Sequence, residues 1–526
     1  MRTLRCEEDR GQGSGLIPVA DGQPNILFII TDQQRVDTVG AYGCGLGATP
    51  TVDRMAEQGI RFENAYCNNP LCMPSRASIL TGRYPSVNGV RTNGCTAYPD
   101  QQLLPELLKS AGYNTAAFGK VHYHPGSSEE ADGYWPEHRG SVQSGIDLTQ
   151  PYLGFDTIRL GLGHSEVLPG LHEQSLAEHH PDILDRSGTK NALTVPDELI
   201  LNAQKIQTYQ SAIPAEHYST NWVADRTIEY LEQVEGPFFA WCGFGDPHHP
   251  FNPPGEYWDR FRPEDMPPPA IREGELEAMP PHFHAFHYGE YAGKDTDGFL
   301  LGSDPYLRDG RVGIIRAAYM GMVALIDDAV ARILATLEAR GLMENTIVFF
   351  LSDHGELLGD HDLILKGAFH YQPLINVPLI AYGPSVLSGG RVVEGPVGLM
   401  DLNPTILELA GVAIPEGTQA RSMQDQLTGG SDRGFDHALI EHDLDLPTGE
   451  VEWSLGLRLR TMVTDRYRIT HYAGESYGEL FDLEADPNEH ENLWDRDVET
   501  RKALQMELLD RVAQSQSCVP PKISHA

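Results

Sequence analysis

The stretch Ile26-Leu27-Phe28-Ile29-Ile30 is apolar at every position and runs directly into Thr31, Asp32 and Gln33. A strand that is apolar on both of its alternating faces is typical of a parallel sheet covered by helices on both sides. In such sheets, ligands bind beyond the carboxyl ends of the strands. The stretch therefore predicts a buried strand that ends in polar residues at a functional edge.

Three further apolar runs have the same arrangement. Residues 116–118 precede Lys120 and His122, residues 238–244 precede Asp246 and His248, and residues 347–351 precede Asp353 and His354. If the four runs are neighbouring parallel strands, the residues that follow them converge on one pocket. One polar residue after a strand is more often an ordinary loop start, but four such runs together favour a functional site.

Segments with helical patterns alternate with the apolar runs. Residues 103–111 have Pro105 in the first turn and Gly112 as a stop, and residues 312–339 carry an apolar stripe at steps of three or four. This alternation predicts an α/β fold with a large mixed, mainly parallel sheet flanked by helices.

The chain divides into three predicted parts. We expect a flexible N-terminal tail over residues 1–23 and a main domain over 24–430. Short alternating runs and a final helix predict a smaller C-terminal α+β subdomain over 431–526. Two long segments, 127–203 and 252–310, interrupt the main domain as insertions. Insertions of this length are usually functional loops, and we expect at least one of them to select the substrate.

The composition is that of a folded, acidic protein. The chain has 526 residues, of which 40% are hydrophobic and 22% charged, and 39 Lys and Arg against 75 Asp and Glu give a formal net charge of −36. An acidic surface repels nucleic acid and anionic membranes, so we expect neither as a partner. No apolar run approaches the roughly 20 residues of a membrane span.

Two further features bear on the location of the protein. The first 23 residues mix charged residues and glycine and lack the apolar stretch of a secretory signal. The seven cysteines are odd in number and widely spaced, which is typical of reduced thiols rather than of a disulfide framework. We therefore expect a cytoplasmic protein, and a homo-oligomeric state stays open.

A candidate nucleophile lies in the stretch Cys72-Met73-Pro74-Ser75-Arg76. Pro74 suits a first helical turn and Gly82 suits a helix end, so we expect Cys72 just before a short helix. Free backbone N–H groups at that point stabilise an anion or a thiolate, and Arg76 can bind a tetrahedral oxyanion. A lone cysteine is more often a small buried apolar residue.

The same stretch, followed by Leu80-Thr81-Gly82-Arg83, matches the pattern C-x-P-S-R-x-x-x-L-T-G-R. With it the chain resembles the type I, formylglycine-dependent sulfatases of the alkaline-phosphatase superfamily. Further segments are similar to motifs of that family: 25–33, Gly119-Lys120-Val121-His122, Pro247-His248-His249-Pro250, Ser352-Asp353-His354-Gly355 and Glu479-Leu480-Phe481-Asp482-Leu483. The resemblance extends from residue 25 to residue 512, apart from the two insertions, and implies an alkaline-phosphatase-like fold.

The resemblance implies the hydrolysis of sulfate monoesters by an arylsulfatase-like enzyme that releases inorganic sulfate and an alcohol or phenol. It implies that a formylglycine-generating maturation enzyme oxidises Cys72 to formylglycine. One hydroxyl of the hydrated aldehyde then attacks sulfur, and the second expels sulfate. The substrate would be a small-molecule or saccharide sulfate ester.

The resemblance also implies the roles of individual residues. Asp32, Gln33, Asp353 and His354 would hold one divalent cation, for which the mostly oxygen ligands favour Ca²⁺, with Mn²⁺ or Mg²⁺ as alternatives. The implied catalytic residues are Cys72, Arg76, Lys120, His122, His248 and Lys366. Arg76 and Lys120 would support the aldehyde diol, and His122 would be the base that regenerates the aldehyde. His248 and Lys366 would hold sulfate and protonate the leaving oxygen.

Two positions depart from the common pattern of the family and keep other functions open. Gln33 stands where many sulfatases have Asp, and His354 stands where many have Asn. This combination resembles the phosphonate monoester hydrolase and phosphodiesterase branch of the superfamily, so hydrolysis of those esters at the same residue is an alternative. A non-catalytic binding protein in which Cys72 stays a thiol is a third hypothesis.

The insertions also prompt a hypothesis about the substrate. Aromatic residues within them could form a wall of the pocket: Trp135, Trp258, Phe283 and Phe286.

Overall fold

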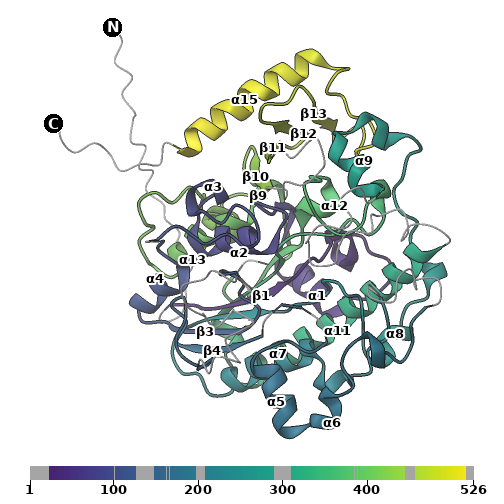
Figure 1. The fold of residues 1–526 in the computed structure, drawn as a ribbon. Helices are drawn as coiled ribbons and strands as arrows, with labels where there is room; N and C mark the ends of the chain where they lie inside the picture. The colour runs from purple at the N-terminus through teal and green to yellow at the C-terminus, as the bar shows by residue number, and fades with distance from the viewer. Residues whose placement is uncertain are drawn as a thin grey trace.

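The computed structural model of the protein describes residues 23–99, 101–125, 147–161, 163–164, 166–196, 208–288, 310–383, 385–387, 389–444 and 456–516. Apart from Gln23, the predicted N-terminal tail lies outside the described residues. Figure 1 shows helices on both sides of a central sheet, with a smaller sheet and the yellow C-terminal helix at one end. The predicted α/β fold class is therefore confirmed.

Nine strands form the large sheet in the described part of the chain. They span Asn25–Thr31 (β1), Ile60–Tyr66 (β2), Asn114–Gly119 (β3), Thr157–Leu160 (β4), Phe238–Gly243 (β5), Thr346–Ser352 (β6), Asn376–Val377 (β7), Leu379–Tyr382 (β8) and Arg391–Gly398 (β9). The order across the sheet is β4-β3-β5-β1-β6-β8-β2-β7, and β9 pairs with β2. The first five strands in this order run parallel, whereas β8 is antiparallel to β6 and β2.

Helices pack on both faces of this sheet. Those that contribute most to its cover span Pro50–Gln58 (α1), Cys72–Thr81 (α2), Leu104–Ser110 (α4), Ser219–Leu231 (α7), Arg311–Ala339 (α11) and Leu402–Leu409 (α13). Other helices span Pro85–Asn88 (α3), Leu171–His179 (α5), Pro181–Leu184 (α6), Glu256–Asp259 (α8), Pro281–His287 (α9), Gln372–Ile375 (α12) and Gln424–Thr428 (α14). Within the described residues, no helix combines the length and the apolar character that crossing a membrane requires.

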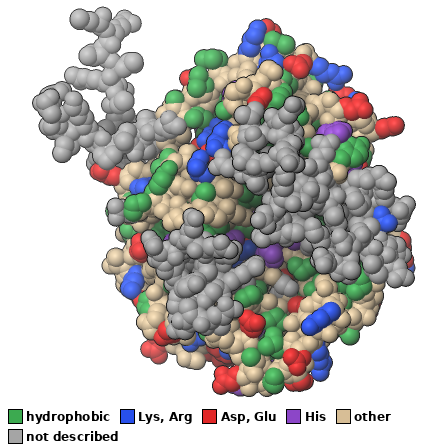
Figure 2. All heavy atoms as spheres, viewed as in Figure 1, with side chains coloured by type: hydrophobic (Ala, Val, Ile, Leu, Met, Phe, Trp, Pro, Cys, Tyr) green, Lys and Arg blue, Asp and Glu red, His purple; other side chains and the backbone are tan. Residues whose placement is uncertain are grey.

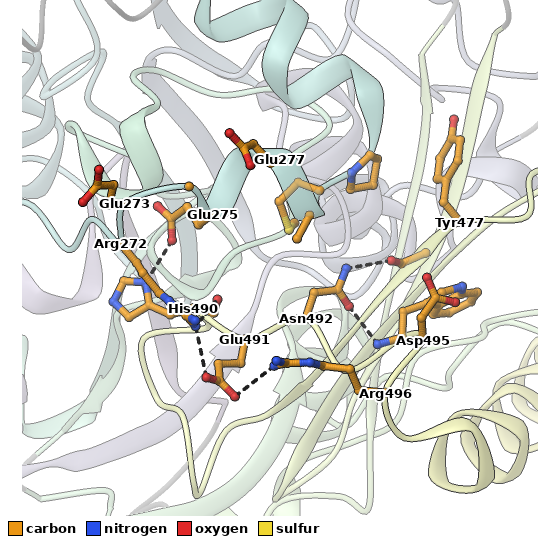
Figure 3. Close-up of a pocket in the computed structure, with 16 residues that line it drawn as sticks. Arg272, Glu273, Glu275, Glu277, Tyr477, His490, Glu491, Asn492, Asp495 and Arg496 are labelled. Carbon is orange, nitrogen blue, oxygen red and sulfur yellow. Dashed lines mark hydrogen bonds and ion pairs between the residues drawn. The ribbon is translucent and has the colours of Figure 1, made fainter.

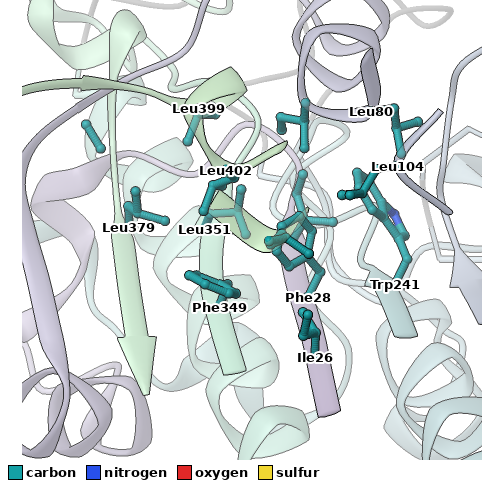
Figure 4. Packing of buried hydrophobic residues seen from close by; sticks show 14 of the residues in the cluster. Ile26, Phe28, Leu80, Leu104, Trp241, Phe349, Leu351, Leu379, Leu399 and Leu402 are labelled. Atoms are coloured by element: carbon teal, nitrogen blue, oxygen red, sulfur yellow. The ribbon is translucent and has the colours of Figure 1, made fainter. Parts of the chain in front are cut away.

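The alternation of side chains along β1 divides the core into two layers. Ile26, Phe28 and Ile30 pack against residues of α2, α4 and α13, whereas Leu27 and Ile29 pack against residues of α1, α7 and α11. Figure 4 shows the first layer, in which the Phe28 ring lies 5.5 Å from Phe349 and 5.7 Å from Trp241. Because both faces of β1 are covered by helices, the strand has to be apolar at every position, as the sequence predicted.

The parallel strands β3, β5, β1 and β6 are neighbours, and the segments that follow them stay in register. The backbone ladder continues beyond the strand ends through hydrogen bonds donated by Asp32 to Asp246 (3.0 Å), by Lys120 to Gly243 (2.8 Å) and by Asp353 to Thr31 (3.2 Å). The polar residues that follow the four strands therefore emerge at one edge of the sheet, which confirms the predicted convergence.

A second, antiparallel sheet follows in the C-terminal part. Its strands span Ala438–Leu444 (β10), Leu457–Val463 (β11), Tyr467–Tyr472 (β12) and Gly478–Asp482 (β13), in that order, and helix Val498–Gln516 (α15) packs on it. The side chains of Ala438 and Ile440 join the core layer of the large sheet. The domain boundary at residue 430 falls between β9 and β10 and stays a prediction.

The structure differs from the sequence-based expectation in one insertion. Segment 127–203 contains strand β4, which pairs with β3 at the edge of the large sheet, and so it is not only a loop. The strand is four residues long and alternates between half-buried and buried side chains. A run this short has too few apolar residues to be recognised as a strand from its pattern.

Gly119 ends β3 immediately before Lys120, and its backbone predicts a measurable effect. Its φ is +74°, and a Cβ added there would lie 2.1 Å from the backbone oxygen of Gly243. We expect Gly119→Ala to lower the free energy of unfolding by about 1–2 kcal/mol for the left-handed backbone and by a further 1–3 kcal/mol, roughly, for the contact.

Gly112→Ala is the matched control, because Gly112 has a φ of +92° and a Cβ there would meet no atom within 4 Å. Chemical denaturation gives the free energy of unfolding of both variants. The larger loss expected for Gly119→Ala measures the effect of the close contact beyond that of the left-handed backbone. Equal stability losses would contradict the close contact between β3 and β5.

Candidate active site

Helix α2 places the candidate nucleophile at the edge where the parallel strands end. Cys72 is the first residue of the helix rather than the residue before it, and it is 2% exposed. Gly82 ends the helix in the left-handed conformation, as predicted from the sequence. The free N–H groups of the first turn and the helix dipole favour negative charge at residue 72.

Arg76 lies one turn further along α2 and is completely buried. Its Nε donates to Asp353 Oδ2 (2.7 Å), its Nη2 to Asp32 Oδ2 (3.3 Å) and its Nη1 to the backbone oxygen of Lys120 (2.8 Å). One guanidinium thus joins the segments that follow β6, β1 and β3. It fixes the two carboxylates relative to Cys72.

Two lysines add positive charge to the site. Lys120 Nζ lies 2.6 Å from Asp32 Oδ2, and Lys366 Nζ lies 3.0 Å from Cys72 Sγ and 3.1 Å from His354 Nε2. Together with the guanidinium of Arg76, these lysines place three cationic side chains around the carboxylates of Asp32 and Asp353. The site therefore carries a local excess of positive charge within a chain whose net charge is −36.

Figure 2 shows acidic side chains spread over the face drawn there, with a few histidine and basic side chains near its centre.

These charges govern the ionisation of residue 72. Burial and the charge of Asp32 would raise the pKa of the Cys72 thiol, but Lys120, Lys366 and His354 outweigh them and lower this pKa to about 6. Burial also works against ionisation of Asp32, but the nearby cations hold the pKa of its carboxyl well below the usual value. The site is thus built to stabilise an anion.

A divalent cation fits between the two carboxylates. Ligand atoms of Asp32, Cys72, Asp353 and His354 all lie within 4.8 Å of one another. Burial and the charge of Asp32 raise the pKa of the Asp353 carboxyl despite its contact with Arg76, and a bound cation would favour the ionised form of this carboxyl. His354 Nδ1 donates a hydrogen bond to the backbone oxygen of Gly355 (2.9 Å), because that oxygen can only accept one. The other ring nitrogen, Nε2, faces the carboxylates of Asp32 and Asp353.

Gln33 contributes a further possible ligand. Its side-chain nitrogen donates to the buried carboxylate of Glu356, and its Oε1 is buried without a hydrogen-bond partner in the described part of the chain. A buried amide oxygen that lacks a hydrogen-bond partner is a suitable ligand for a hard cation. The donor set predicted from the sequence therefore fits a cation.

The two remaining predicted residues are neutral imidazoles near neutral pH. Burial and the charges of Lys120 and Arg76 lower the pKa of His122 well below its usual value. Burial and the neighbouring rings of His164 and His249 do the same for His248. The structure therefore brings all ten predicted site residues to one edge of the sheet.

Sequence reasoning missed two residues that contact the site. His164 comes from the first insertion, and its ring stacks on His248 with centroids 3.5 Å apart. Glu356 orients Gln33 and also accepts from the backbone of Leu358 (3.0 Å). Glu356 directly follows the Ser-Asp-His-Gly motif, which could have drawn attention to it, whereas His164 has no sequence signal.

The predicted aromatic wall is not supported at Phe283. Its side chain is completely buried among Leu357, Phe369 and Tyr371, because α9 packs its apolar face against the loop that follows β6. Trp135 lies outside the described residues.

Comparison with known proteins gives consistent matches. The Sulfatase family model matches residues 24–412, and a model described as N-sulphoglucosamine sulphohydrolase, C-terminal, matches residues 359–517. An arylsulfatase from Clostridium perfringens is 28% identical over 493 residues, which cover 90% of this chain and 90% of that protein. An N-acetylglucosamine-6-O-sulfatase from Bacteroides thetaiotaomicron is 26% identical over 554 residues, covering 94% of this chain and 86% of that protein.

A solved structure is similar over a comparable length. The phosphonate monoester hydrolase of Agrobacterium radiobacter has a TM-score of 0.74 and 25% sequence identity, covering 94% of this chain and 96% of that chain.

The lowered pKa of Cys72 can be measured directly in metal-free protein that retains the cysteine. We expect its thiolate absorbance to rise with pH around a midpoint of about 6, because the surrounding cations favour the thiolate. Lys366→Met should raise the midpoint, because it removes one of these cations.

Cys67→Ser is the control, because burial raises the pKa of the Cys67 thiol well above its usual value and this residue should not contribute to the transition. A midpoint near the ordinary thiol value of about 8.5 would contradict the proposed electrostatics.

Proposed function

Since the chain belongs to the sulfatase family and is a sulfuric ester hydrolase, we propose that it acts through a formylglycine formed from Cys72 and a divalent cation beside it. The family, the enzyme class and the alkaline-phosphatase-like fold agree with the predictions from the sequence. The observation that carries the proposal is the buried cluster of three cations and two carboxylates around residue 72. A sulfate monoester is an anion, and such a cluster can bind it and stabilise the charge that develops during hydrolysis.

The size of the rate enhancement also requires such a cluster. Enzymes lower the barriers of slow reactions by about 8–23 kcal/mol. Removing one donor to a developing oxyanion costs only about 3–4 kcal/mol. Several charges acting on the same group are therefore needed.

Residue 72 would carry the nucleophile. Formylglycine supplies, as its hydrate, one hydroxyl that attacks sulfur and a second that expels sulfate when the aldehyde is regenerated. The thiol of Cys72 is buried at the first turn of α2, next to Lys366 (3.0 Å) and His354 (3.3 Å). A modified side chain there would meet the same cations. The proposed partner for the modification is a formylglycine-generating maturation enzyme.

The cation would be held by Asp32, Gln33, Asp353 and His354. When bound, it lowers the pKa of a neighbouring hydroxyl and binds an oxygen of the sulfate group. The three oxygen donors favour Ca²⁺, and the imidazole makes Mn²⁺ an alternative. The geometry supports this assignment, because Arg76 binds the Oδ2 atoms of both carboxylates, whereas their Oδ1 atoms lie 3.7 and 3.6 Å from His354 Nε2.

His122 and Lys120 would have different roles in proton transfer. His122 is neutral, because burial and two nearby cations lower its pKa, so it can accept the proton that is released when the aldehyde is regenerated. Lys120 is held protonated, since Asp32 and Cys72 outweigh burial and raise its pKa. It would stabilise negative charge at residue 72 without taking part in proton transfer.

Lys366 is the proposed proton donor to the leaving oxygen. His248 Nδ1 lies 2.6 Å from the backbone oxygen of His249, so Nδ1 carries the ring proton and Nε2 of the neutral ring is an acceptor. His248 would have to be protonated before it could act as an acid, and its lowered pKa opposes this. The amino group of Lys366 lies 3.0 Å from Cys72 Sγ, within reach of a group bound at residue 72.

The proposed substrate class is a sulfate ester of a phenol or of a saccharide. The arylsulfatase and N-acetylglucosamine-6-O-sulfatase relatives support this range. A phosphonate monoester or phosphodiester is the second candidate. The similar fold of a phosphonate monoester hydrolase and the pair of Gln33 and His354 favour it. Both esters are tetrahedral anions, so charge alone does not separate them.

Turnover of two model substrates distinguishes these functions. We expect kcat/KM for 4-nitrophenyl sulfate to exceed that for a phenyl phosphonate monoester by at least about tenfold, a difference of roughly 1.4 kcal/mol in transition-state stabilisation. The protein is produced together with a maturation enzyme, and Cys72→Ala, which should abolish both activities, controls for contaminants. A preference for the phosphonate would establish the second function instead.

Removal of the divalent cation tests the metal site. Dialysis against a chelator should lower kcat by about a thousandfold or more, because a bound cation contributes several kcal/mol. Adding Ca²⁺ or Mn²⁺ should restore it. Asp353→Asn should need a higher cation concentration for the same activity. Full activity in protein that elemental analysis shows to be free of divalent metal would refute the metal site.

A further inference from the structure

A second cluster of potential metal ligands lies apart from residue 72. It consists of Glu275, His361 and His490, whose ligand atoms lie within 4.8 Å of one another. The carboxylate of Glu275 is the centre: its Oε2 is 2.9 Å from His490 Nδ1 and 3.4 Å from His361 Nδ1. Figure 3 shows the side chains of Glu275 and His490 pointing toward each other.

The three residues come from distant parts of the chain. Glu275 lies in the second insertion, His361 in the loop between β6 and Lys366, and His490 in the segment that follows β13. Two of them also line a pocket of about 470 Å³ between the insertion and the C-terminal segment. None of the ten predicted active-site residues lines this pocket.

The cluster is buried, and one of its oxygens lacks a partner. The side chains of Glu275 and His361 are only 3% and 2% exposed, and that of His490 is 22% exposed. Glu275 Oε1 is buried and has no hydrogen-bond partner among the described residues. Leaving a buried carboxylate oxygen unpaired is costly, and a hydrogen-bonded cluster of one carboxylate and two imidazoles does not explain it.

The ring of His361 is held in place by its surroundings. It stacks on Tyr371 with ring centroids 3.5 Å apart and an interplanar angle of 2°, and its backbone φ is +57°. A left-handed backbone at a non-glycine residue costs free energy, so the surrounding structure must fix this conformation. The Nδ1 atom is thereby directed at the carboxylate.

The spacing of the ligand atoms suits a tetrahedral metal ion. Zinc binds imidazole nitrogen and carboxylate oxygen at about 2.0–2.1 Å, which places neighbouring ligands of a tetrahedron roughly 3.3 Å apart. The measured separations of 2.9 and 3.4 Å lie close to this value. Two imidazoles and a carboxylate form a donor set that zinc uses with one further position open to water or another ligand.

We propose that Glu275, His361 and His490 form a second divalent-cation site, suited to zinc, with its fourth coordination position open to the neighbouring pocket. A cation there joins the second insertion, the loop that carries Lys366 and the C-terminal segment. The pocket wall beyond His490 is itself ordered by ion pairs of Glu491 with Arg272 (3.1 Å) and Arg496 (3.3 Å). The proposal does not depend on the activity at residue 72.

Zinc content after dialysis tests the site. The full-length protein is stripped of metal, loaded with Ca²⁺ to fill the site at residue 72, equilibrated with Zn²⁺ and dialysed. We expect wild-type protein to retain one zinc ion more than His490→Gln. Zinc should also raise the melting temperature of the wild type and not that of this variant.

His284→Gln is the matched control, because His284 is an exposed histidine on α9 in the same insertion. This variant should keep the additional zinc ion. Glu275→Gln should lose it, and His490→Gln provides the decisive comparison if the buried Glu275 variant fails to fold. Equal zinc retention by wild type and His490→Gln, or no zinc retained by wild-type protein, would overturn the proposal.

Discussion

The buried guanidinium of Arg76 is the interaction on which the rest of the site depends. It binds Asp353, Asp32 and the backbone of Lys120, and therefore connects the ends of β6, β1 and β3 to helix α2. Its full burial is compensated because all these partners are anionic or strongly polar acceptors. Removing one member of a buried charge pair costs about 3–5 kcal/mol, since the remaining charge is left uncompensated. The same contacts that stabilise this edge of the sheet thus determine where the two carboxylates lie.

The local charge of the site is opposite to that of the whole molecule. The formal net charge of the chain is −36, but charges on the surface are largely screened beyond about 10 Å at 0.1 M salt. The cations around residue 72 are buried and close to one another, so screening reduces their effect much less. This separation allows an acidic protein to bind an anionic ester, and it explains why composition alone did not predict the substrate.

Much of the fold and the position of the site could be predicted because both depend on local sequence, whereas the roles of the individual site residues were predicted from the resemblance to the sulfatases. Residues 26–30 are apolar on both faces, which specifies a covered parallel strand, and the polar residues after such strands have to meet at one edge. Other features depend on contacts that no local pattern records. His164 reaches His248 from an insertion, strand β4 is too short to be recognised, and Phe283 is buried where an exposed wall was expected. In the second cluster, His361 and His490 follow Glu275 at distances of 86 and 215 positions along the chain, so no local sequence pattern could indicate that the three residues meet.

Mass spectrometry of the peptide that carries residue 72 tests the central claim most directly, namely that an oxidised residue at the start of α2 performs the chemistry. Protein produced together with a formylglycine-generating enzyme should contain the aldehyde at position 72 and hydrolyse sulfate esters. Protein produced without that enzyme should contain the thiol and be inactive. An intact Cys72 in protein that hydrolyses sulfate esters at the full rate would contradict the claim.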